Sequence, residues 1–199
     1  PAAICDWETP WKVQRRHTRW LYCDASGAYP PLPKHRAKQV RKGHSKGIQL
    51  GISRDVDALV SLHQRARERK DIASDGKALE RLFQWIVQSP HQTSYIAQSE
   101  EGIPIASATF LHNAGRTIYA FGGQKRSKLS GLATVMLMDQ GIQDAAAIGN
   151  QVFDFGGSTD PGVDRFYAEF GAEKVVRHRV VRLAWWARPW LRIVRPDLF

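Results

Sequence analysis

The chain has 199 residues, of which 43% are hydrophobic and 24% charged, a composition typical of one globular domain with its own core. Its 29 lysines and arginines outnumber 19 acidic residues, and the net charge of +10 favours an anionic partner, such as a phosphate-rich cofactor, a nucleic acid or a membrane surface. Cys5 and Cys23 have neither a metal-ligand spacing nor a redox-motif spacing, so we expect no metal, no disulfide framework and a cytoplasmic location. No apolar run approaches ~20 residues, so we expect no membrane span.

The first third of the chain is predicted to be irregular and then basic. Residues 1–33 are rich in Trp, Pro and Arg, so we expect an irregular N-terminal extension or the remnant of a preceding domain, with the main domain over 34–199. The first residue, Pro1, is not methionine, so a longer parent protein or a trimmed chain is expected. Within residues 34–47, eight of fourteen are Lys, Arg or His, which predicts a basic helix that either binds RNA or glycan phosphates or faces solvent.

The rest of the chain alternates between helical and strand periods. Helical spacing of apolar residues predicts helices over 53–70 and 75–89, and Pro90 ends the second. Strands are predicted over 93–99, 103–112 and 117–123, then a buried helix over 129–149, a strand over 151–155, a helix over 161–170 and a strand over 173–185. This order predicts an α/β (α+β) chain with a mixed, mostly antiparallel twisted sheet flanked by helices.

The junction between the strand at 117–123 and the buried helix has the composition of an anion site. The amide groups at the start of a helix are unpaired and the helix dipole adds partial positive charge, so small residues there let phosphate approach. Formal positive charge stands immediately before the helix. The candidate cofactor-binding residues are Gln124, Lys125, Arg126, Lys128, Ser130, Gly131, Leu132 and Ala133.

The pattern Lys-x-x-Gly-x-Ala at 128–133, followed by helix, strand and a helix with Tyr167, resembles the GNAT N-acyltransferase superfamily. A more specific resemblance is to its FemAB-like branch, which is marked by the "FDFGGS" strand and turn at 153–158 and a following Gly-x-x-Arg-Phe-x-x-x-Phe-Gly helix. This resemblance covers roughly residues 30–183 and implies the GNAT-like fold described above. It implies an acyl-CoA donor such as acetyl-CoA, bound by its pyrophosphate at Gly131, and a small amine acceptor.

The resemblance also implies roles for individual residues. Tyr167 would protonate the leaving thiolate, and Asp154, in an otherwise apolar strand, would act as general base or as a structural acid bonded to turn amides. Many FemAB-like members carry Lys after the phenylalanine where this chain has Tyr167, and tyrosine favours a thioester donor. The candidate substrate-binding residues are Gly156, Gly157, Ser158 and Arg165.

Two other functions stay open at this point. FemAB-like enzymes proper transfer an aminoacyl group from tRNA to a cell-wall precursor, which would make tRNA a partner; a non-catalytic anion-binding module is the third interpretation. The tail "WWARPWLRIVRPDLF" mixes Trp and Arg, which suits contact with an anionic membrane at the inner face. We expect instead that Trp185, Trp186 and Trp190 pack on the core, since Pro189 interrupts a long amphipathic helix.

Overall fold

A seven-stranded sheet organises the computed structural model, which describes residues 11–69, 75–157, 160–182 and 185–194. The strands follow the spatial order β2-β3-β4-β5-β6-β1-β7, and every neighbouring pair is antiparallel except β5 and β6. The predicted mixed, mostly antiparallel sheet is thereby confirmed. The strands are β1 (Trp11–Tyr22), β2 (Gln49–Ile52), β3 (Gln92–Gln98), β4 (Pro104–Asn113), β5 (Arg116–Gln124), β6 (Val152–Asp154) and β7 (Glu173–Arg182).

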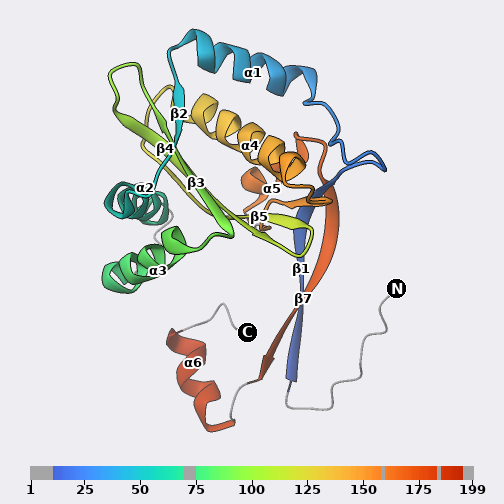
Figure 1. The fold of residues 1–199 in the computed structure, drawn as a ribbon. Helices are drawn as coiled ribbons and strands as arrows, with labels where there is room; N and C mark the ends of the chain where they lie inside the picture. Colours follow the sequence, from blue (N-terminus) through green and yellow to red (C-terminus); the bar gives the residue numbers. More distant parts are fainter. Residues whose placement is uncertain (1–10, 70–74, 158–159, 183–184, 195–199) are drawn as a thin grey trace.

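Helices cover both faces of this sheet, with α1 and α4 on one face and α2 and α3 on the other (Figure 1). Three helices begin at an aspartate whose carboxylate accepts amide hydrogen bonds of the first turn, which fixes where each helix starts. The helical segments are α1 (Lys34–Ser45), α2 (Val56–Glu68), α3 (Gly76–Gln88), α4 (Ser130–Ala147), α5 (Pro161–Ala168), the 3-10 turn η1 (Trp185–Ala187) and α6 (Arg188–Val194).

Two apolar clusters hold these layers together. The larger one lies between the sheet and helices α4 and α5, and Phe110, Phe153 and Met138 are fully buried in it. The smaller one joins α2 and α3 to the opposite face around Leu59 and Phe83. Because both faces of the central strands are covered, β4 has a run of buried residues rather than an alternating pattern.

The prediction of an irregular extension is wrong for residues 11–22, which form β1 inside the sheet. Only Trp20, Leu21 and Tyr22 pair with β6, whereas almost the whole strand pairs with β7, so the two form a ribbon that extends beyond the sheet (Figure 1). Such a ribbon is exposed along much of its length, and arginines therefore replace the apolar residues that would have revealed a strand. Residues 23–33 form no helix or strand, as predicted for this part of the irregular extension.

The parallel pair β5 and β6 separates after Ile118 and Asp154, the last residues that share a register. β5 continues to Gln124, while the chain after β6 turns away through Gly156 and Gly157, both at positive φ. The register between β4 and β5 also shifts at Thr109, leaving Ala120 without a partner in a β-bulge. The sheet is therefore split at its centre, beside a local irregularity of β5.

The C-terminal segment does not pack as predicted. Trp186, Trp190 and Ile193 are 71%, 64% and 82% exposed, so the expectation that the two tryptophans cover the core is wrong. Figure 1 shows α6 at the far end of the β1–β7 ribbon, away from the helices that flank the sheet. Among the described residues, none of the helices has the length and apolar character that a membrane span requires.

Candidate functional site

A cavity of about 390 Å³ opens where β5 and β6 separate. Its walls come from five elements: the end of α2, Ser107 of β4, the glycine-rich end of β5, the start of α4 and one face of α5. The lining is mainly apolar, and its residues with polar side chains are Arg69, Ser107, Tyr119, Gln124, Thr134 and Tyr167. It thus has the character of a small-molecule site.

The start of α4 forms one wall of the cavity. No side chain caps this helix, and the backbone of Gly131 is open, since a Cβ built there would meet no atom within 4 Å. The exposed first turn of a helix offers amide donors and a partial positive charge. The structure therefore brings the predicted anion-binding turn and Tyr167 to one cavity, with open space between them.

A second cavity, of about 670 Å³, shares Gln124 and Arg69 with the first. Its other lining residues include Lys125 and Arg126, which were predicted to bind the cofactor, and Arg65 and Glu68 from α2. Four cations thus face one carboxylate, which favours an anionic occupant. The two cavities together form a slot that is basic at one end and apolar at the other.

Tyr167 lies on the apolar side of this slot. Its ring packs against Phe155 and Tyr119, with centroids 5.0 and 6.4 Å away, and the side chain is only 7% exposed. Burial raises the pKa of Tyr167 well above its ordinary value, and the proximity of Tyr119 adds to this increase. The phenol therefore stays protonated over the whole physiological pH range, as a proton donor must.

Asp154 lies at the end of β6, buried below the turn that leaves the strand. Its Oδ1 accepts hydrogen bonds from the Thr18 hydroxyl at 2.5 Å and the Gly156 amide at 2.8 Å, while Oδ2 is 3.8 Å from the guanidinium of Arg116. These are the bonds expected of a structural acid. Asp154 nevertheless lines a cavity of about 470 Å³ that shares Tyr119 with the apolar slot, so a catalytic role stays a prediction.

Several other predicted site residues lie apart from these cavities. Ala133 is fully buried and its amide already donates to Leu129, and the Ser130 hydroxyl donates to the Lys125 carbonyl. Leu132 packs against the core, Lys128 is exposed outside both cavity walls, and Arg165 is exposed and pairs with Glu169. Ser158 lies outside the described residues. Gly156 and Gly157 line a different, basic cavity beside β1.

The sequence did not point to several residues of the slot, among them Tyr119, Ala66 and Arg69. Tyr119 lines it from β5 with its hydroxyl above Gly122, and burial raises its pKa to about 12. Ala66 and Arg69 reach it because Gly123 lets the α2 backbone approach β5, where a Cβ would collide with the Leu62 carbonyl. The one available signal was the Gly-Gly pair in a strand, which indicates a close backbone approach.

Among the described residues, no group of three or more His, Cys, Asp and Glu side chains is arranged to hold a metal ion. His63, on the inner face of α2, is instead hydrogen-bonded through Nδ1 to the Gly122 carbonyl at 3.0 Å. Burial lowers its pKa below the ordinary value. The histidine thereby joins α2 to the strand that lines the slot.

Comparisons with known proteins agree with this geometry. Residues 34–168 match the family model of the acetyltransferase (GNAT) domain. Among solved structures, FemX has a TM-score of 0.68 at 12% identity, over 90% of this chain and 64% of that chain. The C-terminal domain (DUF2156) of a putative lysylphosphatidylglycerol synthetase from Agrobacterium fabrum has a TM-score of 0.64 at 11% identity, over 94% and 66%.

A third solved structure is a predicted acetyltransferase with acetyl-CoA from Clostridium acetobutylicum, with a TM-score of 0.50 at 19% identity over 61% of this chain and 86% of that one. The search of curated proteins found no significant match. At these identities the likeness is one of fold, and it supports the FemAB-like resemblance of the sequence. The chain spans just under two thirds of the length of FemX and of the synthetase domain.

Proposed function

We propose, from the premise that this chain belongs to the acetyltransferase (GNAT) domain family, that it transfers an acyl group from a coenzyme A thioester to a primary amine. The observation that carries the proposal is the slot itself. It joins the open first turn of α4 and the basic residues Lys125 and Arg126 to Tyr167, whose side chain is largely buried. A diphosphate at the basic end would leave a thioester to extend along the apolar end.

The proposed reaction is direct attack of the amine nitrogen on the acyl carbonyl. The N–C bond forms and the C–S bond breaks, Tyr167 donates a proton to the departing thiolate, and the ammonium proton passes to a base or to water. The bulge at Ala120 interrupts the β4–β5 ladder beside the slot, and we assign its backbone amide as the donor to the developing oxyanion. The walls of the slot position the amine and the thioester, and this positioning supplies the rest of the rate enhancement.

Two roles fit Asp154, and one substitution separates them. As a general base, its carboxylate would take the amine proton from the cavity that it lines; as a structural acid, it would hold the turn at Gly156. Asp154→Asn keeps the size of the side chain. A general base predicts a large loss of kcat with an unchanged unfolding temperature, whereas a structural acid predicts a lower unfolding temperature with little change in the kcat of the folded protein.

Calorimetric titration with acetyl-CoA tests the donor. We expect micromolar binding that weakens at least about 100-fold in Gly131→Glu, because a carboxylate would then occupy the site of the pyrophosphate. The matched control is Ala147→Glu, which adds the same charge at the exposed far end of the same helix and should change affinity less than about threefold. Absence of heat with both acetyl-CoA and free coenzyme A would refute the proposal, as would equal binding by both variants.

An aminoacyl-tRNA donor is the second candidate, and exposed charge on α1 favours it. Lys38, Arg41 and Lys42 are exposed on this helix. Arg36 is not part of this surface, because it is buried between Phe166 and Phe170 with its guanidinium bonded to Glu169. A tRNA donor predicts tight binding that weakens steeply with salt and that falls when these three charges are removed, together with no heat from acetyl-CoA.

A further inference from the structure

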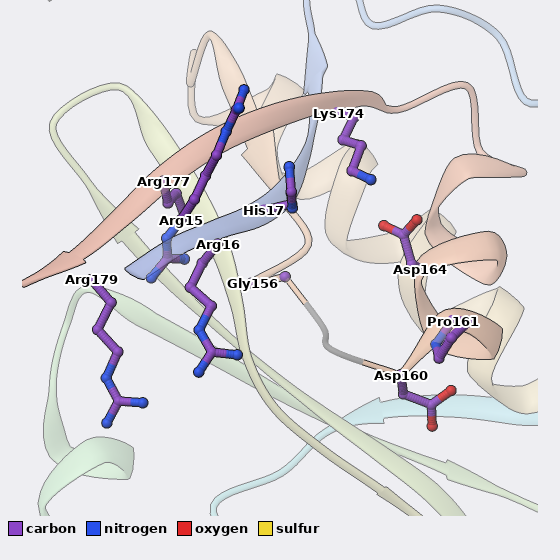
Figure 2. Close-up of a pocket in the computed structure, with 11 residues that line it drawn as sticks. Arg15, Arg16, His17, Gly156, Asp160, Pro161, Asp164, Lys174, Arg177 and Arg179 are labelled. Carbon is purple, nitrogen blue, oxygen red and sulfur yellow. The ribbon is translucent and has the colours of Figure 1, made fainter. Parts of the chain in front are cut away.

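A second basic cavity, of about 700 Å³, lies between the β1–β7 ribbon, the Gly156–Gly157 turn and the start of α5. Figure 2 shows Arg16 and Arg179 extending from the two strands into the space that Asp160 and Pro161 border from the opposite side. This cavity is separate from the one beside α4. Its lining residues are Arg15, Arg16, His17, Gly156, Gly157, Asp160, Pro161, Asp164, Lys174, Arg177 and Arg179.

The charge of this cavity is not balanced by its own carboxylates. Five of its residues are arginine or lysine and two are aspartate. Asp164 forms a two-pronged ion pair at 2.8 and 2.7 Å with Arg19, which does not line the cavity, and Asp160 accepts the amides that start α5. Among the described residues, no carboxylate forms an ion pair with Arg16 or Arg177.

The position of two arginines is itself unfavourable without a ligand. Arg16 stands directly opposite Arg177 in the β1–β7 register, and Arg179 follows two residues later on the same face. Like charges directly opposite each other destabilise an antiparallel pair. A solvated surface ribbon gains nothing from this arrangement, whereas an anion bound between guanidinium groups would turn the repulsion into attraction.

This cavity is also connected to the proposed reaction centre. The cavity that contains Asp154 shares Gly156 and Arg177 with the basic cavity on one side, and Tyr119 with the apolar slot on the other. A molecule whose anionic group lies at Arg16 and Arg177 can therefore reach toward Tyr119. The donor end of the slot lies on the opposite side of the same gap between β5 and β6.

We propose that the cavity between β1, β7 and α5 binds a phosphate group of the acceptor, so that the acceptor is a phosphate-bearing amine. This inference rests on the proposed acyl transfer only in that the bound molecule is taken to be the acceptor. The anion site itself does not depend on that reaction. The guanidinium forks of Arg16 and Arg177 hold the phosphate oxygens. The glycine turn leaves room for the rest of the molecule to pass toward the slot.

Titration of the full chain with pyrophosphate tests the site. The titration is made with the Gly131→Glu variant, in which the anion-binding turn of α4 is blocked. It needs no acyl donor, so the result can be interpreted even if the proposed acyl transfer is wrong. We expect Arg16→Gln with Arg177→Gln to weaken binding at least about tenfold. The control, Lys77→Gln with Arg81→Gln, removes the same charge from two exposed positions of α3 outside this cavity and should change affinity less than about twofold.

Two further arms identify the source of the phosphate. Soluble sn-glycerol 3-phosphate is titrated in one, and vesicles of phosphatidylglycerol with phosphatidylcholine are compared with pure phosphatidylcholine in the other. If the arginine double variant loses affinity only for sn-glycerol 3-phosphate, the phosphate belongs to a soluble ester. If it loses affinity only for the phosphatidylglycerol vesicles, the phosphate belongs to a lipid headgroup. Equal affinity of the arginine and control variants for pyrophosphate and in both arms would overturn the proposal.

Stability measurements separate a binding role from a structural one. Removing the like-charged pair of Arg16 and Arg177 should leave the unfolding midpoint of the phosphate-free protein unchanged or raise it. A lower midpoint together with unchanged phosphate affinity would show that the arginines serve the fold, and would overturn the proposal.

Discussion

Removing the hydroxyl of Tyr167 separates catalysis from folding. Tyr167→Phe leaves the ring in its contacts with Phe155 and Tyr119, and none of the described side chains is hydrogen-bonded to the lost hydroxyl. We therefore expect the free energy of unfolding to change by less than about 1 kcal/mol. Loss of a general acid instead costs about 10²–10⁴ in kcat, or about 3–5 kcal/mol in the activation barrier.

The assay follows release of the coenzyme A thiol at saturating acetyl-CoA with phosphoethanolamine and other primary amines as acceptors. The matched control is Tyr119→Phe, which removes the same atom from the neighbouring buried ring. If Tyr167 alone is the acid, the control keeps kcat within about threefold. Retention of more than about a third of kcat by Tyr167→Phe, with intact folding, would refute the assignment.

The pH dependence gives a second test of the same residue. A proton donor is active below its pKa, and burial raises the pKa of Tyr167, so the range in which it can donate extends upward. We expect no fall in kcat from tyrosine ionisation below pH ~10, the ordinary tyrosine pKa. A fall near pH 8 in the parent protein that disappears in Tyr167→Phe would contradict the argument from burial.

Three predictions concern the frame around the site, each measured by urea unfolding. Gly157→Ala should lower the free energy of unfolding by about 2–4 kcal/mol, because its φ is +73° and a Cβ would lie 2.5 Å from a backbone carbonyl oxygen. Gly171→Ala, at φ +85° in open space, should lower it by only about 1 kcal/mol, and equal losses would refute the clash. Arg36→Met should cost about 1–3 kcal/mol through lost hydrogen bonds and ring stacking, and a neutral result would refute that burial argument. The hydrogen bond from Arg19 lowers the pKa of Asp164, so the stabilisation from this pair is present above pH ~4 and is lost as the pH falls further. Asp164→Asn should therefore reduce the stability lost between pH 7 and 3 by up to about 1 kcal/mol, and an unchanged loss would contradict this.

The elements that the sequence predicted correctly are those with a strong local signal. The long apolar run of α4 and the end of α3 before Pro90 depend on neighbours within a few residues. The anion site at the first turn of α4 was predicted from its own composition in the same way, and it stays a prediction. Local propensity and local hydrogen bonding decided these elements, and both can be read from a single sequence.

The strands β1 and β2 were missed because tertiary contacts define them. Trp20 pairs with Asp154, which is 134 residues later, and the exposed ribbon carries arginine where a buried strand would carry valine or isoleucine. β2 is a four-residue edge strand that is mostly exposed. The cavity wall from Ala66 and Arg69 was missed for the same reason, since it depends on how α2 crosses β5.

The proposed site divides binding from chemistry along one path through the sheet. Arg65, Lys125 and Arg126 line one end and Arg16 and Arg177 the other, whereas the middle is largely apolar and contains the buried tyrosines. Charges at the two ends hold ground state and transition state alike, so they increase occupancy without lowering the barrier. The rate enhancement must then come from the middle, where low polarity keeps a phenol protonated beside the bond that breaks. An excess of positive charge at both ends is what such a division requires when both substrates carry phosphate.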